Sequence, residues 1–185
     1  VFSQAYAAAP VCAPSRYSIQ FGKTPARLSV VRVGMNTDHI QHEALLSIPK
    51  ALAGVDSNYV AGHFGKWGMG SHPSILGYAH SDGPNQNKAG GFVNDRSQWT
   101  VEPKEDPKRI GELTRSALEF MAEANASNRP FYLQVSHYAV HASIQATPGN
   151  LETFESKGAG VRHMDTGFAA MTADLDAGLG TLMRG

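Results

Sequence analysis

The chain is poor in cysteine, with one among 185 residues. A lone thiol excludes an internal disulfide, so Cys12 is either a small buried hydrophobic group or a chemical group placed for use. The formal net charge is zero and no basic run is present, so we expect no nucleic-acid partner. No apolar run is long enough to span a bilayer, so we expect no membrane span.

The start of the chain lacks an initiator methionine, a basic segment and an apolar leader. We therefore interpret the sequence as an internal piece of a longer protein, and the missing leader gives no information on location. One cysteine does not separate the cytosol from an oxidising compartment either. The length suffices for one domain with a substantial core, and no repeat divides it.

The residues around Cys12 predict a helix. Pro14 suits a first helical turn, and Gly22 suits the position just after a helix that runs to Phe21. Cys12 would then lie at the helix N-terminus, where unpaired N–H groups favour negative charge. Arg16 follows one turn later on the same side. The segment therefore predicts an anion pocket with a sulfur atom at its mouth, and the alternative is a half-buried cysteine beside an ordinary helix.

Hydrophobic spacing and turn residues predict an α/β fold. The expected helices cover residues 47–54, 107–126 and 165–183, and the expected strands cover residues 58–64 and 131–135. Residues 77–99 are rich in Gly, Asn, Asp and Ser and are typical of a long surface loop. Helix and strand in alternation favour a mixed, mostly parallel sheet flanked by helices.

Lys66 and His141 follow the two expected strands closely, where catalytic groups of such sheets cluster. A lysine considered alone would be interpreted as solvated. His137 and His141 are four residues apart, which on a helix would suggest a zinc pair, but the run before them favours a strand. His137 fits a packed, hydrogen-bonded histidine as well as a site residue. We interpret Asp174 and Asp176 as solvated helix charges, because residues two apart do not share a helix face.

Four segments resemble, in the same order, the motifs of the formylglycine-dependent (type I) sulfatases. Cys12-Ala13-Pro14-Ser15-Arg16 is similar to the family's active-site signature. The other three resemble a Gly-Lys-Trp-His-x-Gly motif, a strand that ends in Ala-Pro-His, and the helix after that strand; they cover residues 62–70, 130–141 and 169–180. One short motif is weak, but four in family order over nearly the whole chain form a specific signal.

The resemblance implies a fold and a reaction. The fold would be the alkaline-phosphatase-like fold of the sulfatases, and residues 1–185 would be part of one catalytic domain that lacks its N-terminal and C-terminal segments. The reaction would be hydrolysis of a sulfate ester, on a sulfated small molecule or glycan. A formylglycine-generating maturation enzyme would oxidise Cys12 to formylglycine, whose hydrated aldehyde would attack sulfur. The family implies a periplasmic, secreted or lysosomal location.

The resemblance also assigns roles to five residues. Cys12, as formylglycine, would be the nucleophile and a calcium ligand. Arg16 would hold the hydrated aldehyde with its guanidinium, and Lys66 would place a positive charge on the sulfate. His141 would bind sulfate or protonate the leaving oxygen, and His137 is a weaker candidate for substrate binding.

The chain departs from the family pattern at several positions. Gly68 stands where a histidine commonly follows Lys-Trp, Val140 replaces the usual proline, and residues 20–23 read Gln-Phe-Gly-Lys instead of Leu-Thr-Gly-Arg. The remaining calcium ligands of the family lie outside this chain, and the loop at 82–87 does not fit an EF-hand. We therefore expect this chain alone to be poorly active or inactive and to expose sheet edges.

Two other functions stay open from the sequence. A phosphoryl- or phosphonate-transfer enzyme of the same fold would use residue 12 directly as a nucleophile. A non-catalytic member would bind sulfated glycans without cleaving them, and the histidine missing at Gly68 favours that alternative.

Overall fold

The structure is a computed structural model that describes residues 3–87 and 100–185. The chain forms two compact units, with two strands that pass from the first unit into the second. Unit 1 comprises Val1–His63, Trp67–Gln86 and Ala124–Gln134, and unit 2 comprises Phe64–Lys66, Asn87–Glu123 and Val135–Gly185. Each unit is described by itself below.

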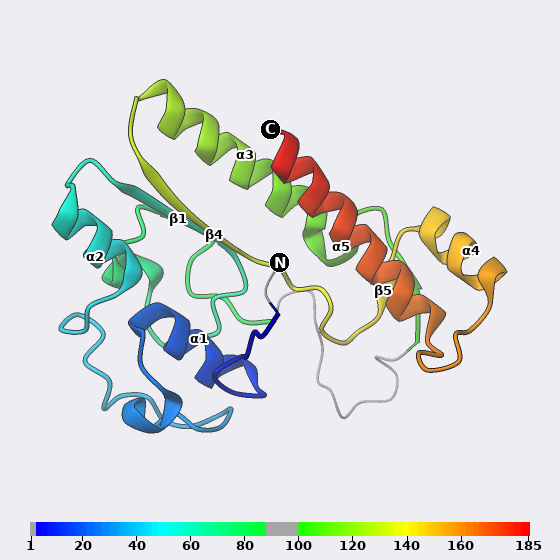
Figure 1. Cartoon of the computed structure of the whole chain (residues 1–185), viewed down its shortest axis with the longest axis horizontal. Helices are drawn as coiled ribbons and strands as arrows, with labels where there is room; N and C mark the ends of the chain where they lie inside the picture. The colour runs from blue at the N-terminus through cyan, green and yellow to red at the C-terminus, as the bar shows by residue number, and fades with distance from the viewer. Residues whose placement is uncertain (1–2, 88–99) are drawn as a thin grey trace. The chain divides into compact units, whose positions relative to one another are not determined.

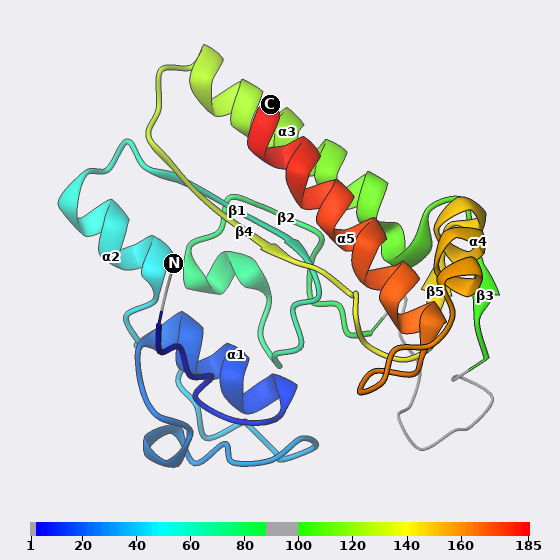
Figure 2. The ribbon, with the colours of Figure 1, turned by 45° about the vertical axis from the view of Figure 1, so that its right-hand side comes forward.

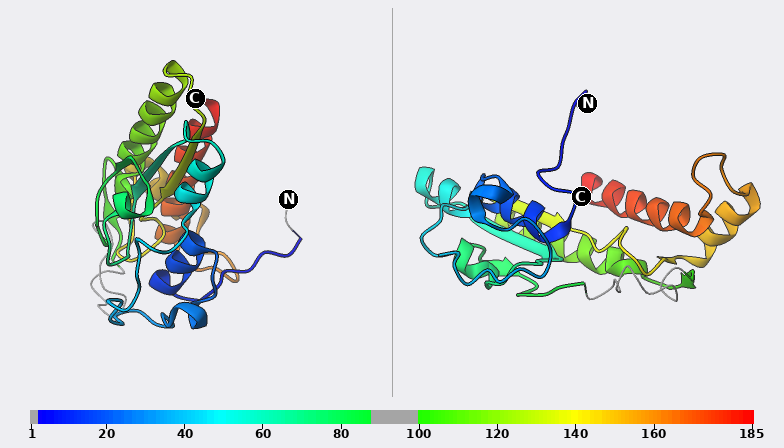
Figure 3. Two further views of the ribbon diagram at one scale, coloured as in Figure 1. Left: turned by 90° about the vertical axis from the view of Figure 1, so that its left-hand side faces the viewer. Right: turned by 90° about the horizontal axis from the view of Figure 1, so that it is seen from below.

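Unit 1 begins with an irregular segment that leads into the first helix (Figure 3). Its helical elements are α1 (Cys12–Phe21), the short 3-10 helix η1 (Pro25–Leu28), α2 (Ile48–Val55) and η2 (Pro73–Leu76). Its core is rich in aromatic side chains, among them Tyr17, Trp67 and Tyr78, each less than 3% exposed. Burial of such large side chains provides the main stabilisation of a unit of this size.

A three-stranded sheet has the order β2-β1-β4, with β1 at Val60–Gly65, β2 at His80–Ser81 and β4 at Phe131–Ser136. β1 and β2 are parallel. β1 and β4 lie side by side and run in the same direction, because Val60 N donates to Pro130 O and Lys66 N donates to Ser136 O (Figure 1). All six residues of β1 are buried, as expected for the middle strand of a parallel sheet.

Unit 2 holds a second pair of parallel strands and the longer helices of the chain. Its elements are β3 (Glu102–Pro103), η4 (Pro107–Arg109), α3 (Ile110–Ala126), which ends in unit 1, β5 (Gln145–Ala146), α4 (Pro148–Lys157) and α5 (Thr166–Arg184). α5 lies beside α3 (Figure 2), and a Cβ atom on Gly178 would overlap the Ile110 side chain. Glycine at residue 178 therefore permits the two helices to approach closely.

The structure confirms the expected α/β class, with a parallel sheet and flanking helices. The expected helices and strands are present, with ends shifted by a few residues. The expected loop at 77–99 contains the two-residue strand β2, and its residues 88–99 lie outside the described residues. Within the described ranges, no helix is long and apolar enough to cross a membrane.

The interpretation of Asp174 as a solvated charge was wrong. Its side chain is only 7% exposed, and its carboxylate accepts hydrogen bonds from Thr147 N at 2.8 Å, Thr147 Oγ1 at 2.7 Å and Asn150 Nδ2 at 2.7 Å. Asp174 of α5 therefore fixes the beginning of α4, a helix that the sequence pattern did not predict. Asp176 is exposed, as expected.

Candidate active site

Cys12 is the first residue of α1 and is half-buried. The residue before it, Val11, is extended and caps the helix without a side-chain hydrogen bond, so the first N–H groups of α1 have no side-chain cap. Ser15 Oγ donates to Ala9 O at 2.7 Å and fixes the segment that enters the helix. Gly22 ends α1 with φ 61°, as the sequence predicted. The predicted helix is therefore confirmed, and it begins two residues earlier than expected.

Arg16 lies one helical turn after Cys12 and is half-buried. His63, from the middle of β1, is a buried neighbour of this arginine in unit 1. Burial, with the positive charge of Arg16 as a second cause, lowers the pKa of His63 to about 4. His63 is therefore neutral near pH 7 and adds no second positive charge beside Arg16.

Lys66 directly follows β1 and is only 4% exposed. Its backbone N–H donates to Ser136 O at 2.8 Å, at the end of β4. The preceding residue, Gly65, has φ 95°, a conformation that glycine adopts without strain. Burial of this degree is rare for a lysine whose ammonium group is not paired.

The turn after Lys66 is fixed by one residue of unit 1, Asn85, through its side chain and its backbone carbonyl. Trp67 N donates to Asn85 Oδ1 at 2.9 Å, and Gly68 N donates to Asn85 O at 3.0 Å. Gly68 has φ 65°, in the left-handed region. The residue that replaces the family's histidine therefore also suits a backbone that favours glycine.

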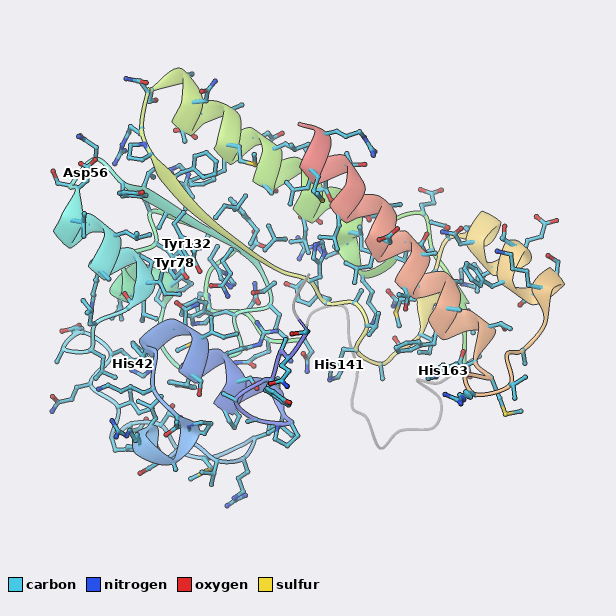
Figure 4. The ribbon with its side chains drawn as sticks, in the orientation of Figure 1. His42, Asp56, Tyr78, Tyr132, His141 and His163 are labelled. Atoms are coloured by element: carbon cyan, nitrogen blue, oxygen red, sulfur yellow. The ribbon has the colours of Figure 1, made fainter. Side chains whose placement is uncertain are left out.

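His137 and His141 follow the end of β4 and are both half-buried. Figure 4 labels His141. His141 Nδ1 lies 2.7 Å from Ala142 O and must donate to it, which leaves Nε2 for a ligand. Both ring nitrogens of His137 are buried and have no hydrogen-bond partner among the described residues. Burial lowers the pKa of His137 below its usual value. For His137, the choice between a packed histidine and a site residue therefore stays a prediction.

The structure thus gathers the five predicted residues in two groups. Unit 1 holds Cys12 and Arg16 on one helix, and unit 2 holds Lys66, His137 and His141 after the ends of β1 and β4. The sequence analysis did not single out His63. Its signal was a polar residue within an otherwise apolar strand, flanked by Gly62 and Phe64.

Two further features bear on the site. No group of three or more His, Cys, Asp or Glu side chains among residues 3–87 and 100–185 could hold a metal ion. A groove of about 500 Å³ lies in unit 2 between α3 and α5, and none of the five predicted residues lines it. We therefore base the candidate active site on side-chain chemistry and not on this groove.

The chain is similar in sequence and in structure to known proteins. The chain is 25% identical to an N-acetylgalactosamine-6-sulfatase of Canis lupus familiaris, over 89% of this chain and 38% of that protein. It is similar to the crystal structure of Ps i-CgsB, with a TM-score of 0.70, 23% identity and coverage of 97% of this chain and 45% of that one. The structure of Ps i-CgsB in complex with k-i-k-neocarrahexaose gives a TM-score of 0.71 at the same identity and coverage.

The chain therefore spans less than half the length of these relatives. The likeness to the solved structures shows the fold, which is the one expected from the four motifs. The sequence model of the family named Sulfatase matches residues 1–184, which is nearly the whole chain. The chain belongs to the sulfatase family.

Proposed function

We propose that this chain is part of a sulfuric ester hydrolase that removes sulfate from a carbohydrate and uses a formylglycine made from Cys12. The observation that carries the proposal is the position of Cys12 as the first residue of α1, with Arg16 one turn later. A maturation enzyme requires access to the thiol, and Cys12 is only half-buried. The Cys-x-Pro-x-Arg sequence around it is intact.

The carbohydrate substrate is supported by the relatives. One is named for action on a sulfated N-acetylgalactosamine, and another is described in complex with a neocarrahexaose. Both cover this chain nearly completely, although this chain covers less than half of each. We therefore extend to this protein the general class of a sulfated sugar and no particular sugar.

The surroundings of residue 12 suit a formylglycine. The hydrated aldehyde would supply a nucleophilic oxygen, which the native thiol does not have. The uncapped N–H groups at the start of α1 favour an anion beside residue 12, and the Arg16 guanidinium adds a fixed fork of donors one turn away. Neutral His63 adds no further positive charge to this region of unit 1.

Lys66, His137 and His141 would act on the sulfate ester. Lys66 would stabilise negative charge on the sulfate oxygens, since its backbone is fixed by the bond to Ser136. His141 donates through Nδ1 to Ala142, so Nε2 is the atom that would deliver a proton to the leaving oxygen. His137 has two ring nitrogens without a partner among the described residues, and either nitrogen would hold a substrate oxygen.

Calcium does not fit the described residues by themselves. The family would supply calcium with several carboxylates, and no cluster of three or more ligating side chains occurs among the residues described. If calcium takes part, most of its ligands come from sequence outside this chain. We accordingly assign no step of the reaction to a metal ion.

The proposal is tested by mass spectrometry of the peptide that contains residue 12. The chain is produced together with a formylglycine-generating enzyme and digested, and we expect an aldehyde, with sulfur lost and oxygen gained. An unmodified thiol under conditions that mature a known sulfatase contradicts the proposal. That result would favour a phosphoryl- or phosphonate-transfer enzyme that uses residue 12 directly.

Gly68 supports one second candidate, a protein that binds sulfated glycans without cleaving them. Because Gly68 has φ 65°, a histidine at this position would adopt the left-handed backbone region, which is unfavourable for residues other than glycine. Kinetics and binding measured on a longer protein that contains this chain separate the two candidates. Turnover of a sulfated sugar supports the hydrolase, and binding without turnover by a protein with formylglycine at residue 12 supports the binder.

A further inference from the structure

A buried hydrogen-bond network connects α1 to the rest of unit 1. Its members are Gln20 of α1, Tyr78 from the segment after η2, and Tyr132 and Gln134 of β4. Gln20 and Tyr78 are 1% and 2% exposed. None of these residues belongs to the proposed reaction, and Gln20 stands where the family motif commonly has leucine. The network is therefore a polar feature of this chain at a position that the family usually fills with an apolar side chain.

The hydrogen bonds of the network join hydroxyl or amide N–H donors to amide oxygens. Burial raises the pKa of Tyr78 far above its usual value, so the hydroxyl keeps its proton; it donates to Gln20 Oε1 at 2.9 Å and also lies 3.1 Å from a second acceptor, Gln134 Oε1. Gln20 Nε2 donates to Gln134 Oε1 at 2.9 Å. Tyr132 also donates to Gln134 Oε1, at 3.1 Å. Each amide oxygen is thus satisfied, which a buried polar group requires.

The ring of Tyr78 makes a second set of contacts. It meets the ring of His63 edge-on at 5.5 Å and that of Trp67 at 5.7 Å, and the His63 and Trp67 rings are themselves 4.9 Å apart. Tyr78 and Tyr132 also lie next to each other, with ring centroids 6.2 Å apart (Figure 4). Tyr78 therefore contacts Trp67, which follows Lys66, and His63, the histidine beside Arg16. Its hydroxyl also bonds to α1, the helix that begins at Cys12.

We propose that Tyr78 is a positioning residue, which through Gln20 holds α1 so that Cys12 and Arg16 keep a fixed place for the reaction. Gln20 lies one turn after Arg16 and two turns after Cys12, so movement at Gln20 is transmitted along a short, rigid helix. This inference rests on the proposed function for its catalytic part. The attachment of α1 is a separate statement and has its own test.

The first test is amide hydrogen exchange on the 185-residue chain, which requires no activity. Tyr78→Phe keeps the ring contacts and removes only the hydroxyl, which donates to Gln20 and lies within hydrogen-bond distance of Gln134. We expect the amides of α1 to exchange about tenfold faster, the factor expected from loss of one buried hydrogen bond. The comparison variant is Tyr132→Phe, which removes a hydroxyl that bonds to Gln134 and Tyr78 but not to α1, so we expect a smaller change in the exchange of α1. Equal exchange of α1 in both variants overturns the attachment.

The second test measures kinetics of sulfate-ester hydrolysis in a longer protein that contains this chain, with residue 12 matured. Tyr78→Phe is expected to lower kcat about tenfold with KM within about twofold, because the nucleophile is displaced while the other anion-binding groups remain. The double variant Tyr78→Phe with Gln20→Leu should lose less than the sum of the losses of the two single variants, because the two residues share one hydrogen bond while Gln20 also bonds to Gln134. Unchanged kcat in Tyr78→Phe, or additive losses, overturns the positioning role.

The two tests separate this inference from the proposed function. A parent protein with no hydrolysis of any sulfate ester contradicts the proposed function and, with it, the positioning role in catalysis. Faster exchange of α1 in Tyr78→Phe would still support the attachment of the helix. An active parent whose Tyr78→Phe variant keeps full kcat contradicts only the positioning role.

Discussion

Gly65 packs directly against the carbonyl group of Ser136. A Cβ atom on Gly65 would stand 2.8 Å from the Ser136 carbonyl carbon and closer still to its oxygen. The same oxygen accepts the hydrogen bond from Lys66 N at 2.8 Å. The place of Lys66 at the end of β1 therefore depends on the absence of a side chain at residue 65.

Replacement of this glycine should be costly. Gly65→Ala places a methyl group against backbone atoms and forces a left-handed conformation at φ 95°. We expect the free energy of unfolding to fall by about 2–4 kcal/mol. The measurement is urea unfolding of the chain. Gly149→Ala is the control, because a Cβ atom there meets nothing within 4 Å. Similar stability of the two variants would show that Gly65 is not required.

Asp174 and Asp176 form a matched pair of carboxylates on α5. Asp174→Ala removes the acceptor of three hydrogen bonds at the start of α4, so we expect a loss of about 3 kcal/mol in the free energy of unfolding. Asp176→Ala changes an exposed residue and should stay within about 0.5 kcal/mol. Chemical denaturation measures both. A loss for Asp176→Ala as large as that for Asp174→Ala would disprove the role of Asp174.

The lowered pKa of His63 predicts that the stability of the chain depends on pH. Its pKa is about 4 in the folded chain and about 6.5 when unfolded, so between these values the unfolded chain binds the extra proton. The contribution of His63 to the free energy of unfolding is therefore fully present above pH 6.5. It declines by up to about 3 kcal/mol as the pH falls toward 4. His63→Leu removes this contribution, and the unfolding free energy measured across that range should decline less. The same decline in both proteins would exclude His63 as its source.

Gly68→His tests the departure from the family motif. Because residue 68 has φ 65°, we expect the histidine to cost about 1–2 kcal/mol in stability. Gly68→Asn should cost less, since asparagine tolerates the left-handed region better than histidine at a non-glycine position. Thermal unfolding compares the two variants. If Gly68→His is as stable as the parent, the backbone at residue 68 does not select glycine.

The elements that the sequence predicted well are those with local signals. α3 and α5 follow from apolar residues at helical spacing, and the end of α1 follows from Gly22. α4 was missed because Leu151 is its main buried residue and the helix has little apolar periodicity. Thr147 and Pro148 carried a signal for its start, since a threonine cap before proline is typical of a helix N-terminus.

Local elements that carry the candidate site were predictable from motifs, and contacts between distant residues were not. Cys12 and Arg16 are four residues apart, so their shared helix follows from the sequence. Asp174 bonds to Thr147, 27 residues away, and Tyr78 bonds to Gln20, 58 residues away. No local pattern contains such pairs, because they form only when the chain folds.

The central claim is that residue 12, matured to formylglycine, is required for hydrolysis of a sulfate ester. The most direct measurement is release of sulfate from a sulfated sugar by a longer protein that contains this chain, compared with its Cys12→Ala variant. Both are produced with the maturation enzyme, and folding of the variant is checked by thermal unfolding. We predict that Cys12→Ala falls to the uncatalysed background while its unfolding temperature is unchanged. A folded Cys12→Ala protein that keeps full sulfate release would contradict the account.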